Sequence, residues 1–104
     1  MLLEIRRYEI VPGRRDEFAE WFDREVLPEM ETAGMRIIGQ FVSRDDPNGF
    51  FYLRAFSDEE ERARQLQRLE GSEKWQNDLI EYARALETGY HVEVVIPTAG
   101  SRLR

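Results

Sequence analysis

The sequence contains no cysteine, a single histidine and no long hydrophobic run. Without cysteine there is no disulfide, no thiolate nucleophile and no Cys-ligated zinc. The single histidine, His91, excludes a site in which several histidines of one subunit bind a metal. No window approaches the roughly 18 apolar residues of a membrane-spanning helix, and the first residues lack the pattern of a secretory signal. We therefore expect a cytoplasmic protein that uses no metal and no cofactor and makes no membrane contact.

Charge is abundant by contrast. Of the 104 residues, 35% are charged, and the net charge is -6. This acidic balance is unlike the basic surface that nucleic-acid binding requires, so we expect no nucleic-acid partner. The length suits one hydrophobic core, and there is no repeat or linker. Residues 1–97 are expected to form a single domain, and residues 98–104, which follow Pro97, a flexible tail.

Hydrophobic spacing and turn residues divide the chain into predicted strands and helices. Strands are predicted at residues 2–11, 35–44, 50–56 and 90–96. One helix is predicted between Gly13 and Gly34, with a kink or restart at Pro28. A second helical region runs to Gly89 in two pieces, with Ser57 as the hydroxyl cap of the first and Ser72 as the cap of the second. Gly89 is expected to end this helix.

The order strand, helix, strand, strand, helix, strand predicts an α+β fold of the ferredoxin-like βαββαβ type. Its four-stranded antiparallel sheet would have helices on one face, with the first and third strands in the centre. Residues 50–56 and 90–96 carry aromatic and branched side chains in both parities. Such strands are more apolar than a solvated face normally is, which favours a homodimer formed through the sheet faces.

Several short motifs resemble the NIPSNAP family. They are Glu4-Ile5-Arg6-x-Tyr8-x-Ile10-x-Pro12-Gly13, Leu27-Pro28, Gly39-Gln40-Phe41, the run from Asn48 to Phe56, Glu61-Arg62 and Glu73-Lys74-Trp75. The resemblance covers most of the chain up to Trp75, and the order and spacing of the motifs carry it. It implies a dimeric α+β barrel, in which two ferredoxin-like sheets close face to face around a lumen.

The resemblance leaves two functional hypotheses. The first is a binding or interaction protein, whose barrel lumen holds a small organic ligand or which simply forms a stable dimer. The alternative is a cofactor-independent monooxygenase or isomerase acting on a small aromatic or ketide-like substrate, as in the wider superfamily of such barrels. The sequence departs from the family at Tyr52, where the family often has His, and at Arg54, where an aromatic residue is common.

Strand alternation places Glu4, Arg6 and Tyr8 on one face of the opening strand. If that face looks into the barrel, Arg6 is suited to bind a carboxylate or enolate, and Tyr8 to donate a hydrogen bond or proton. The same residues fit a structural ion pair with an attached phenol, and this interpretation is favoured. Tyr52 and Arg54 share a face of the third strand and either extend the cluster or face solvent.

His91 is the one side chain whose unperturbed pKa lies near neutrality. It therefore joins Arg6 and Tyr8 as a catalytic candidate, although a histidine at the start of a strand is more often a surface or interface residue. The predicted ligand-binding residues are Glu4, Arg6, Tyr8, Tyr52 and Arg54. No metal site is predicted, because the turn Pro47-Asn48-Gly49 accounts for the adjacent Asp45-Asp46 pair.

Overall fold

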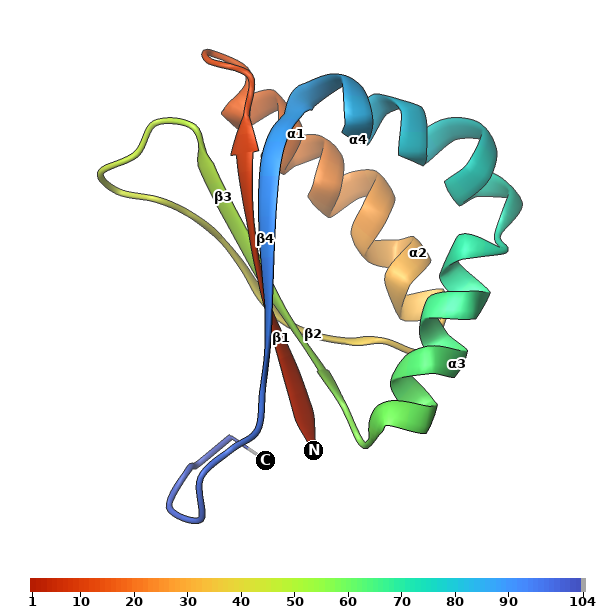
Figure 1. The fold of residues 1–104 in the computed structure, drawn as a ribbon. Helices are drawn as coiled ribbons and strands as arrows, with labels where there is room; N and C mark the ends of the chain where they lie inside the picture. Colours follow the sequence, from red (N-terminus) through yellow and green to blue (C-terminus); the bar gives the residue numbers. More distant parts are fainter. Residues whose placement is uncertain (104) are drawn as a thin grey trace.

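The computed structural model describes residues 1–103 as a sheet covered on one face by helices (Figure 1). Its elements, in chain order, are β1 (Leu2–Ile10), α1 (Arg15–Trp21), the π-helical turn η1 (Phe22–Val26), α2 (Leu27–Thr32), β2 (Arg36–Val42), β3 (Gly49–Phe56), α3 (Glu59–Glu70), the π-helical turn η2 (Trp75–Leu79), α4 (Ile80–Leu86) and β4 (Glu87–Val95). No helix within residues 1–103 is long and apolar enough to cross a membrane.

The four strands form one antiparallel sheet in the order β2-β3-β1-β4. The first and third strands therefore lie in the centre, as the sequence predicts. Figure 1 shows all helices on the same side of this sheet. This arrangement confirms the α+β ferredoxin-like fold.

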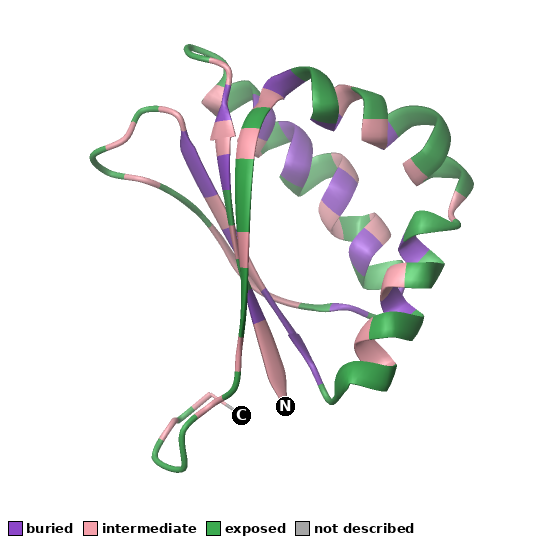
Figure 2. Ribbon diagram, in the orientation of Figure 1, coloured by how far each residue is buried: buried purple, intermediate pink, exposed green. Residues whose placement is uncertain are grey.

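The core lies between the sheet and the first helical region. Phe18, Phe22 and Met30 are almost fully buried and follow the helical spacing seen in the sequence. They pack on Phe50 and Tyr52 of β3, and the Phe18 and Phe50 rings meet edge-on with centroids 5.2 Å apart. Figure 2 shows the buried residues concentrated where helices and sheet face each other.

The helix between Gly13 and Gly34 is interrupted near Pro28, as predicted. The chain widens into η1 and restarts as α2, with Pro28 in the first turn of the new helix, where its missing N–H is least costly. Gly34 ends the helix with a φ of +93°, a conformation that favours glycine.

The N-cap of α3 differs from the prediction. Asp58, not Ser57, caps the helix: its backbone is extended, and its Oδ1 accepts a hydrogen bond of 2.8 Å from the Glu61 N–H. Both residues suit a cap, and the position at which the backbone becomes helical decides between them. The predicted cap at Ser72 is confirmed by the bond of 3.0 Å from the Trp75 N–H to its Oγ.

The last helix ends earlier than predicted. α4 stops at Leu86 and β4 begins at Glu87, so Gly89 lies inside the strand rather than at the helix end. The end of β1 supplies the reason, because the Val11 N–H donates to the Leu86 carbonyl and Ile10 pairs with Glu87. Pairing with β1 therefore begins β4 at Glu87, before Gly89, the residue at which the local sequence favours the end of the helix.

The sheet face away from the helices is rich in apolar side chains. Register places Leu3 and Ile5 of β1 beside Leu53 of β3, with Phe41 of β2 further along the same face. Ile5 is 37% exposed and Phe41 52% exposed. We call this surface the open face.

Candidate functional site

The structure brings the five predicted ligand-binding residues together on the helix-covered side of the sheet. In the pairing of β1 with β3, Glu4 lies opposite Arg54 and Arg6 opposite Tyr52. Glu4, Tyr8, Tyr52 and Arg54 are all buried, and Arg6 is mostly so. Tyr52 and Arg54 therefore extend the Glu4–Arg6–Tyr8 cluster. The trio does not lie on the open face, the face that would line a barrel lumen between two sheets.

Glu4 is the centre of an ion-pair cluster. Its side chain is fully buried; Oε1 accepts hydrogen bonds from Arg6 Nη1 at 2.8 Å and Arg54 Nε at 2.6 Å. Oε2 accepts from Arg62 Nε of α3 at 2.6 Å. Burial alone would raise the pKa of this carboxyl, but attraction to Arg54 and the hydrogen bonds from the three guanidinium groups lower it to about 2. Glu4 is therefore a carboxylate at neutral pH.

Arg6 links this cluster to a pair of tyrosines. Its Nε donates to the Tyr8 hydroxyl at 2.9 Å, and the hydroxyl oxygens of Tyr8 and Tyr52 lie 3.3 Å apart. The two rings stack with centroids 5.7 Å apart. Burial, followed by the proximity of Tyr52, raises the pKa of Tyr8 well above its usual value, so it remains a phenol. Because Arg6 donates to its oxygen, the Tyr8 proton is available to Tyr52 or to a ligand.

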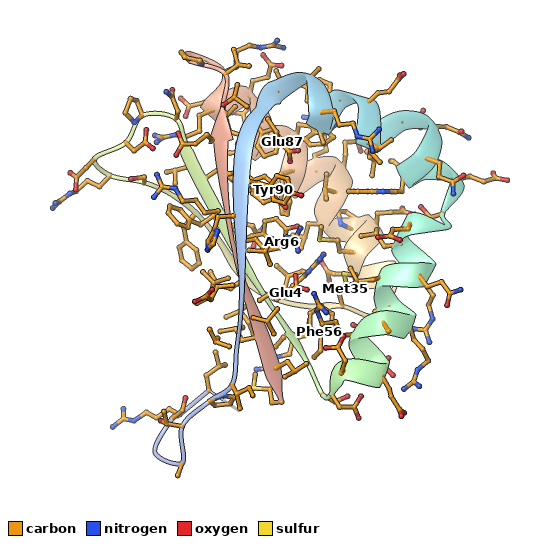
Figure 3. The ribbon with its side chains drawn as sticks, viewed as in Figure 1. Glu4, Arg6, Met35, Phe56, Glu87 and Tyr90 are labelled. Atoms are coloured by element: carbon orange, nitrogen blue, oxygen red, sulfur yellow. The ribbon has the colours of Figure 1, made fainter. Side chains whose placement is uncertain are left out.

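A pocket of about 590 Å³ lies over these residues, between the sheet and the second helical region. Arg6, Tyr8 and Arg54 line its sheet side. Its opposite wall includes apolar side chains of α3, η2 and α4: Leu66, Leu69, Trp75, Ile80 and Ala83. Figure 3 shows Glu87, Tyr90, Arg6 and Glu4 in succession along the space between sheet and helices. The arrangement suits a molecule with a polar end on the sheet and an apolar body under the helices.

Positive charge exceeds negative charge in the Glu4 cluster, at the sheet side of the pocket. Arg62 has Glu59 as a second partner at 3.0 Å, whereas Arg6 and Arg54 share Glu4. Within residues 1–103, the Nη2 groups of Arg6 and Arg54 donate no hydrogen bond to the protein. Two guanidinium groups with unused donors and one shared carboxylate can accommodate a further anion.

Glu87 is a pocket residue that the sequence does not reveal. It is the first residue of β4, it is half-buried, and its carboxyl has no hydrogen-bond or ion-pair partner within residues 1–103. Burial raises its pKa to about 7, against opposing attraction from Arg6 and Arg84. The Glu87 carboxyl thus changes charge near neutral pH.

A β-bulge aims Glu87 into the pocket. Glu9 pairs with Gly89 and Ile10 with Glu87, so Thr88 is an extra residue without an opposite partner. If the side chains of β4 alternated without interruption from His91, Glu87 would lie on the open face. Because of the bulge, the Glu87 side chain instead lies on the pocket side of the sheet, the side on which Ile10 is buried. A glycine inside a strand can mark a bulge, but Gly89 is also a good helix stop, so the sequence signal is ambiguous. Arg62, too, is not singled out as a cluster residue by the sequence.

The other predicted catalytic candidate lies elsewhere. His91 pairs with Arg7 on the open face, its side chain is 76% exposed, and Glu93 Oε2 is 3.9 Å from its Nε2. The structure therefore separates His91 from Arg6 and Tyr8 by the thickness of the sheet. No group of three or more metal-ligating side chains occurs within the described residues.

The fold and its helix-covered pocket define an α+β ferredoxin-like domain, and comparison with known proteins places it in a family. The sequence profile of NIPSNAP matches residues 3–102, so the chain belongs to the NIPSNAP family. This membership confirms the resemblance of the short motifs. Among curated proteins, no sequence match is found.

Solved structures agree with this assignment. A NIPSNAP-domain protein from Burkholderia xenovorans superimposes with a TM-score of 0.90 at 24% identity, over 97% of this chain and 98% of that chain. A NIPSNAP family protein of unknown function from Agrobacterium tumefaciens gives a TM-score of 0.91 at 24% identity, over 100% and 94% of the two chains. A putative antibiotic biosynthesis monooxygenase from Nitrosomonas europaea gives 0.71 at 12% identity, over 93% and 98%. These likenesses concern the fold and assign no activity.

Proposed function

We propose that this NIPSNAP-family protein is a homodimer that binds a small organic anion in the pocket between its sheet and helices. The observation that carries the proposal is the pocket of about 590 Å³, which Arg6 and Arg54 line. Its volume lies within the range of about 300–1,000 Å³ typical of small-molecule sites. The ligand site is thus under the helices of one subunit rather than in a lumen between two sheets.

The charges of the cluster favour an anion over a neutral ligand. With Arg62 also paired to Glu59, the other two guanidinium groups of the cluster, those of Arg6 and Arg54, share one carboxylate. A carboxylate, enolate or phenolate would take the Nη2 donors of Arg6 and Arg54 and restore charge balance in a largely buried place. The apolar wall that includes Leu66 and Trp75 suits a hydrocarbon or aromatic body.

The open face supports the homodimer. Ile5 and Phe41 are substantially exposed there, and Leu3, Phe51 and Leu53 share the surface. An apolar sheet face of this kind is normally covered, and pairing with a second copy covers it symmetrically. A cytoplasmic location, expected from the sequence, belongs to the same proposal and is tested by cell fractionation.

A purely structural or interaction dimer is the competing function. It needs the open face but no ligand, and it treats the arginines as structural ion pairs. The buried geometry of Glu4 is compatible with this function. The unused Nη2 donors and the space in front of them favour ligand binding instead.

Calorimetric titration with phenylacetate and with its neutral amide tests the proposal. Both probes have the same aromatic body, so a Kd at least about tenfold lower for phenylacetate would report recognition of the charge, about 1.4 kcal/mol. Arg6→Gln should abolish that preference. Arg64→Gln is the matched control, because Arg64 is exposed and pairs with Glu61 away from the pocket.

Native mass spectrometry of the same preparations completes the test. The wild type should appear as a dimer of the 12.4 kDa chain. A dimer that shows no preference for phenylacetate, and no binding of other small carboxylates, would favour the structural function. A monomer would remove the open-face argument.

A further inference from the structure

We propose that Glu87 is the proton acceptor of this pocket and that the ligand class is a carbon acid, a 2-oxo or 1,3-dicarbonyl anion whose enolate is held by Arg6 and Tyr8. This inference rests on the proposed function and deepens it, because it names the substrate class and the reaction of the same site. It also replaces His91, which lies on the opposite face of the sheet, as the candidate base.

The geometry of Glu87 is unusual for a structural carboxylate. Structural acids that are partly buried normally accept hydrogen bonds, as Glu4 does from three arginines. Within residues 1–103 the Glu87 carboxyl accepts none, yet the β4 bulge turns it away from solvent and into the pocket. A half-buried carboxyl without a hydrogen-bond partner in the described part of the chain is well suited to contact a ligand.

The pocket that Glu87 lines also holds groups that take different roles in the proposed proton transfer. The charged and tyrosine residues that line the pocket together with Glu87 are Arg6, Tyr8, Tyr52, Arg54, Glu70, Arg84 and Tyr90. Tyr90 stacks on Tyr8 with ring centroids 6.0 Å apart. Figure 3 shows Glu87 above Tyr90 and Arg6, so the carboxyl lies at one end of the pocket and the guanidinium lies further along the same sheet surface. A ligand between them would present its carbon or hydroxyl to Glu87 and its oxygen to Arg6 and Tyr8.

The proposed step balances without an oxidant or reductant. The Glu87 carboxylate takes a proton from the carbon next to a carbonyl. The electron pair of the broken C–H bond becomes the C=C bond, and the carbonyl π pair moves to oxygen. The Arg6 guanidinium attracts the negative charge there, and the Tyr8 phenol donates a hydrogen bond to it. Return of the proton from Glu87, to the same carbon or to a conjugated one, gives exchange or isomerisation.

The acidity of Glu87 suits this role. Burial raises its pKa to about 7, so at neutral pH both its basic and its acidic forms are populated. The positive charges of Arg6 and Arg84 oppose this rise. The basic form is the carboxylate, so kcat/KM for proton removal should rise as the pH passes upward through about 7.

Deuterium exchange of the methylene protons of phenylpyruvate, followed by proton NMR, tests the proposal. The wild type should accelerate exchange over buffer, with the pH dependence described above. Glu87→Gln keeps the shape and removes the base, so the exchange rate should fall about a hundredfold or more, while the Kd for phenylpyruvate changes less than about threefold. Glu87→Asp, which keeps a carboxyl, should recover part of the rate.

Glu81→Gln is the matched control, because Glu81 is an exposed acid of α4 outside the pocket, and its exchange rate should equal the wild-type rate. Wild-type protein that binds phenylpyruvate but does not accelerate exchange would overturn the role of Glu87 and leave the proposed function standing. An equal loss in Glu81→Gln and Glu87→Gln would also overturn that role. Protein that binds neither phenylpyruvate nor phenylacetate would overturn the proposed function itself.

Discussion

The Glu4 cluster gives a prediction whose size follows from the structure. Glu4→Gln leaves three arginines without their common carboxylate in a fully buried position. The folded protein lowers the pKa of Glu4 from 4.5 to about 2, and each unit corresponds to 1.36 kcal/mol, so the carboxylate form stabilises the fold by about 3 kcal/mol. Breaking one partner of a buried pair typically costs about 3–5 kcal/mol, which agrees.

The pH dependence of this loss distinguishes the cluster from simple packing. A lowered pKa stabilises the fold above the unfolded value of 4.5, and the effect disappears as the pH falls through about 2. The free energies of unfolding of wild type and Glu4→Gln should therefore differ by about 3 kcal/mol at neutral pH and converge as the pH falls through about 2. Urea denaturation monitored by tryptophan fluorescence measures both, because Trp21 is buried in the core.

Glu59→Gln is the control for this experiment. Glu59 also pairs with Arg62, but its side chain is 66% exposed, so its loss should cost less than about 1 kcal/mol. A Glu4→Gln protein within about 1 kcal/mol of wild type at neutral pH would refute the reasoning, as would a difference that does not change with pH. If Glu4→Gln does not fold, carbon NMR titration of the Glu4 carboxyl in the wild type should still give a pKa near 2.

Two further predictions concern stability. Asp58→Ala should lower the free energy of unfolding, measured in urea, by about 1 kcal/mol, because the Glu61 N–H loses its acceptor. Ser57→Ala should lower it clearly less, and equal losses would contradict the assignment of Asp58 as the cap. For Glu87, a pKa raised from 4.5 to about 7 means that ionisation weakens the fold as the pH rises through this interval. Glu87→Gln should thus match the wild type near pH 4 and be more stable above pH 7 by about 1–2 kcal/mol, a value reduced for partial exposure. A pH-independent difference in thermal denaturation would argue against a raised pKa.

The overall fold is predictable from the sequence because its signals are local and agree with each other. The spacing of Phe18, Phe22 and Met30 predicts the first helical region, and Pro28 predicts its interruption. The turn between β2 and β3 follows from Pro47-Asn48-Gly49. Errors occur at element ends, where two adjacent residues can serve as cap or where pairing with another strand begins a residue or two early.

The residues that β1 contributes to the cluster are predictable as well, because strand alternation is a local rule, whereas Arg62 of α3 is not. Alternation places Glu4, Arg6 and Tyr8 on one face, and the central position of β3 brings Tyr52 and Arg54 beside them. Which face the helices cover is not predictable. β1 buries Glu4 and exposes Leu3 and Ile5 more than Glu4, against the usual preference, and this inversion depends on the arginines of β1, β3 and α3 that compensate Glu4.

The inversion links the two parts of the proposed function. A strand that places Glu4 and Arg6 under the helices places Leu3 and Ile5 on the open face, since side chains alternate with a period of two. The buried side then gains a charged pocket floor, and the open face gains a surface that a second copy can cover. The bulge at Thr88 interrupts this alternation in β4, and it sends Glu87 to the pocket instead of the open face. Deleting Thr88 would restore regular pairing and keep Glu87 opposite Ile10, so Glu87 should still face the pocket and both proton transfer and the Glu4 cluster should remain.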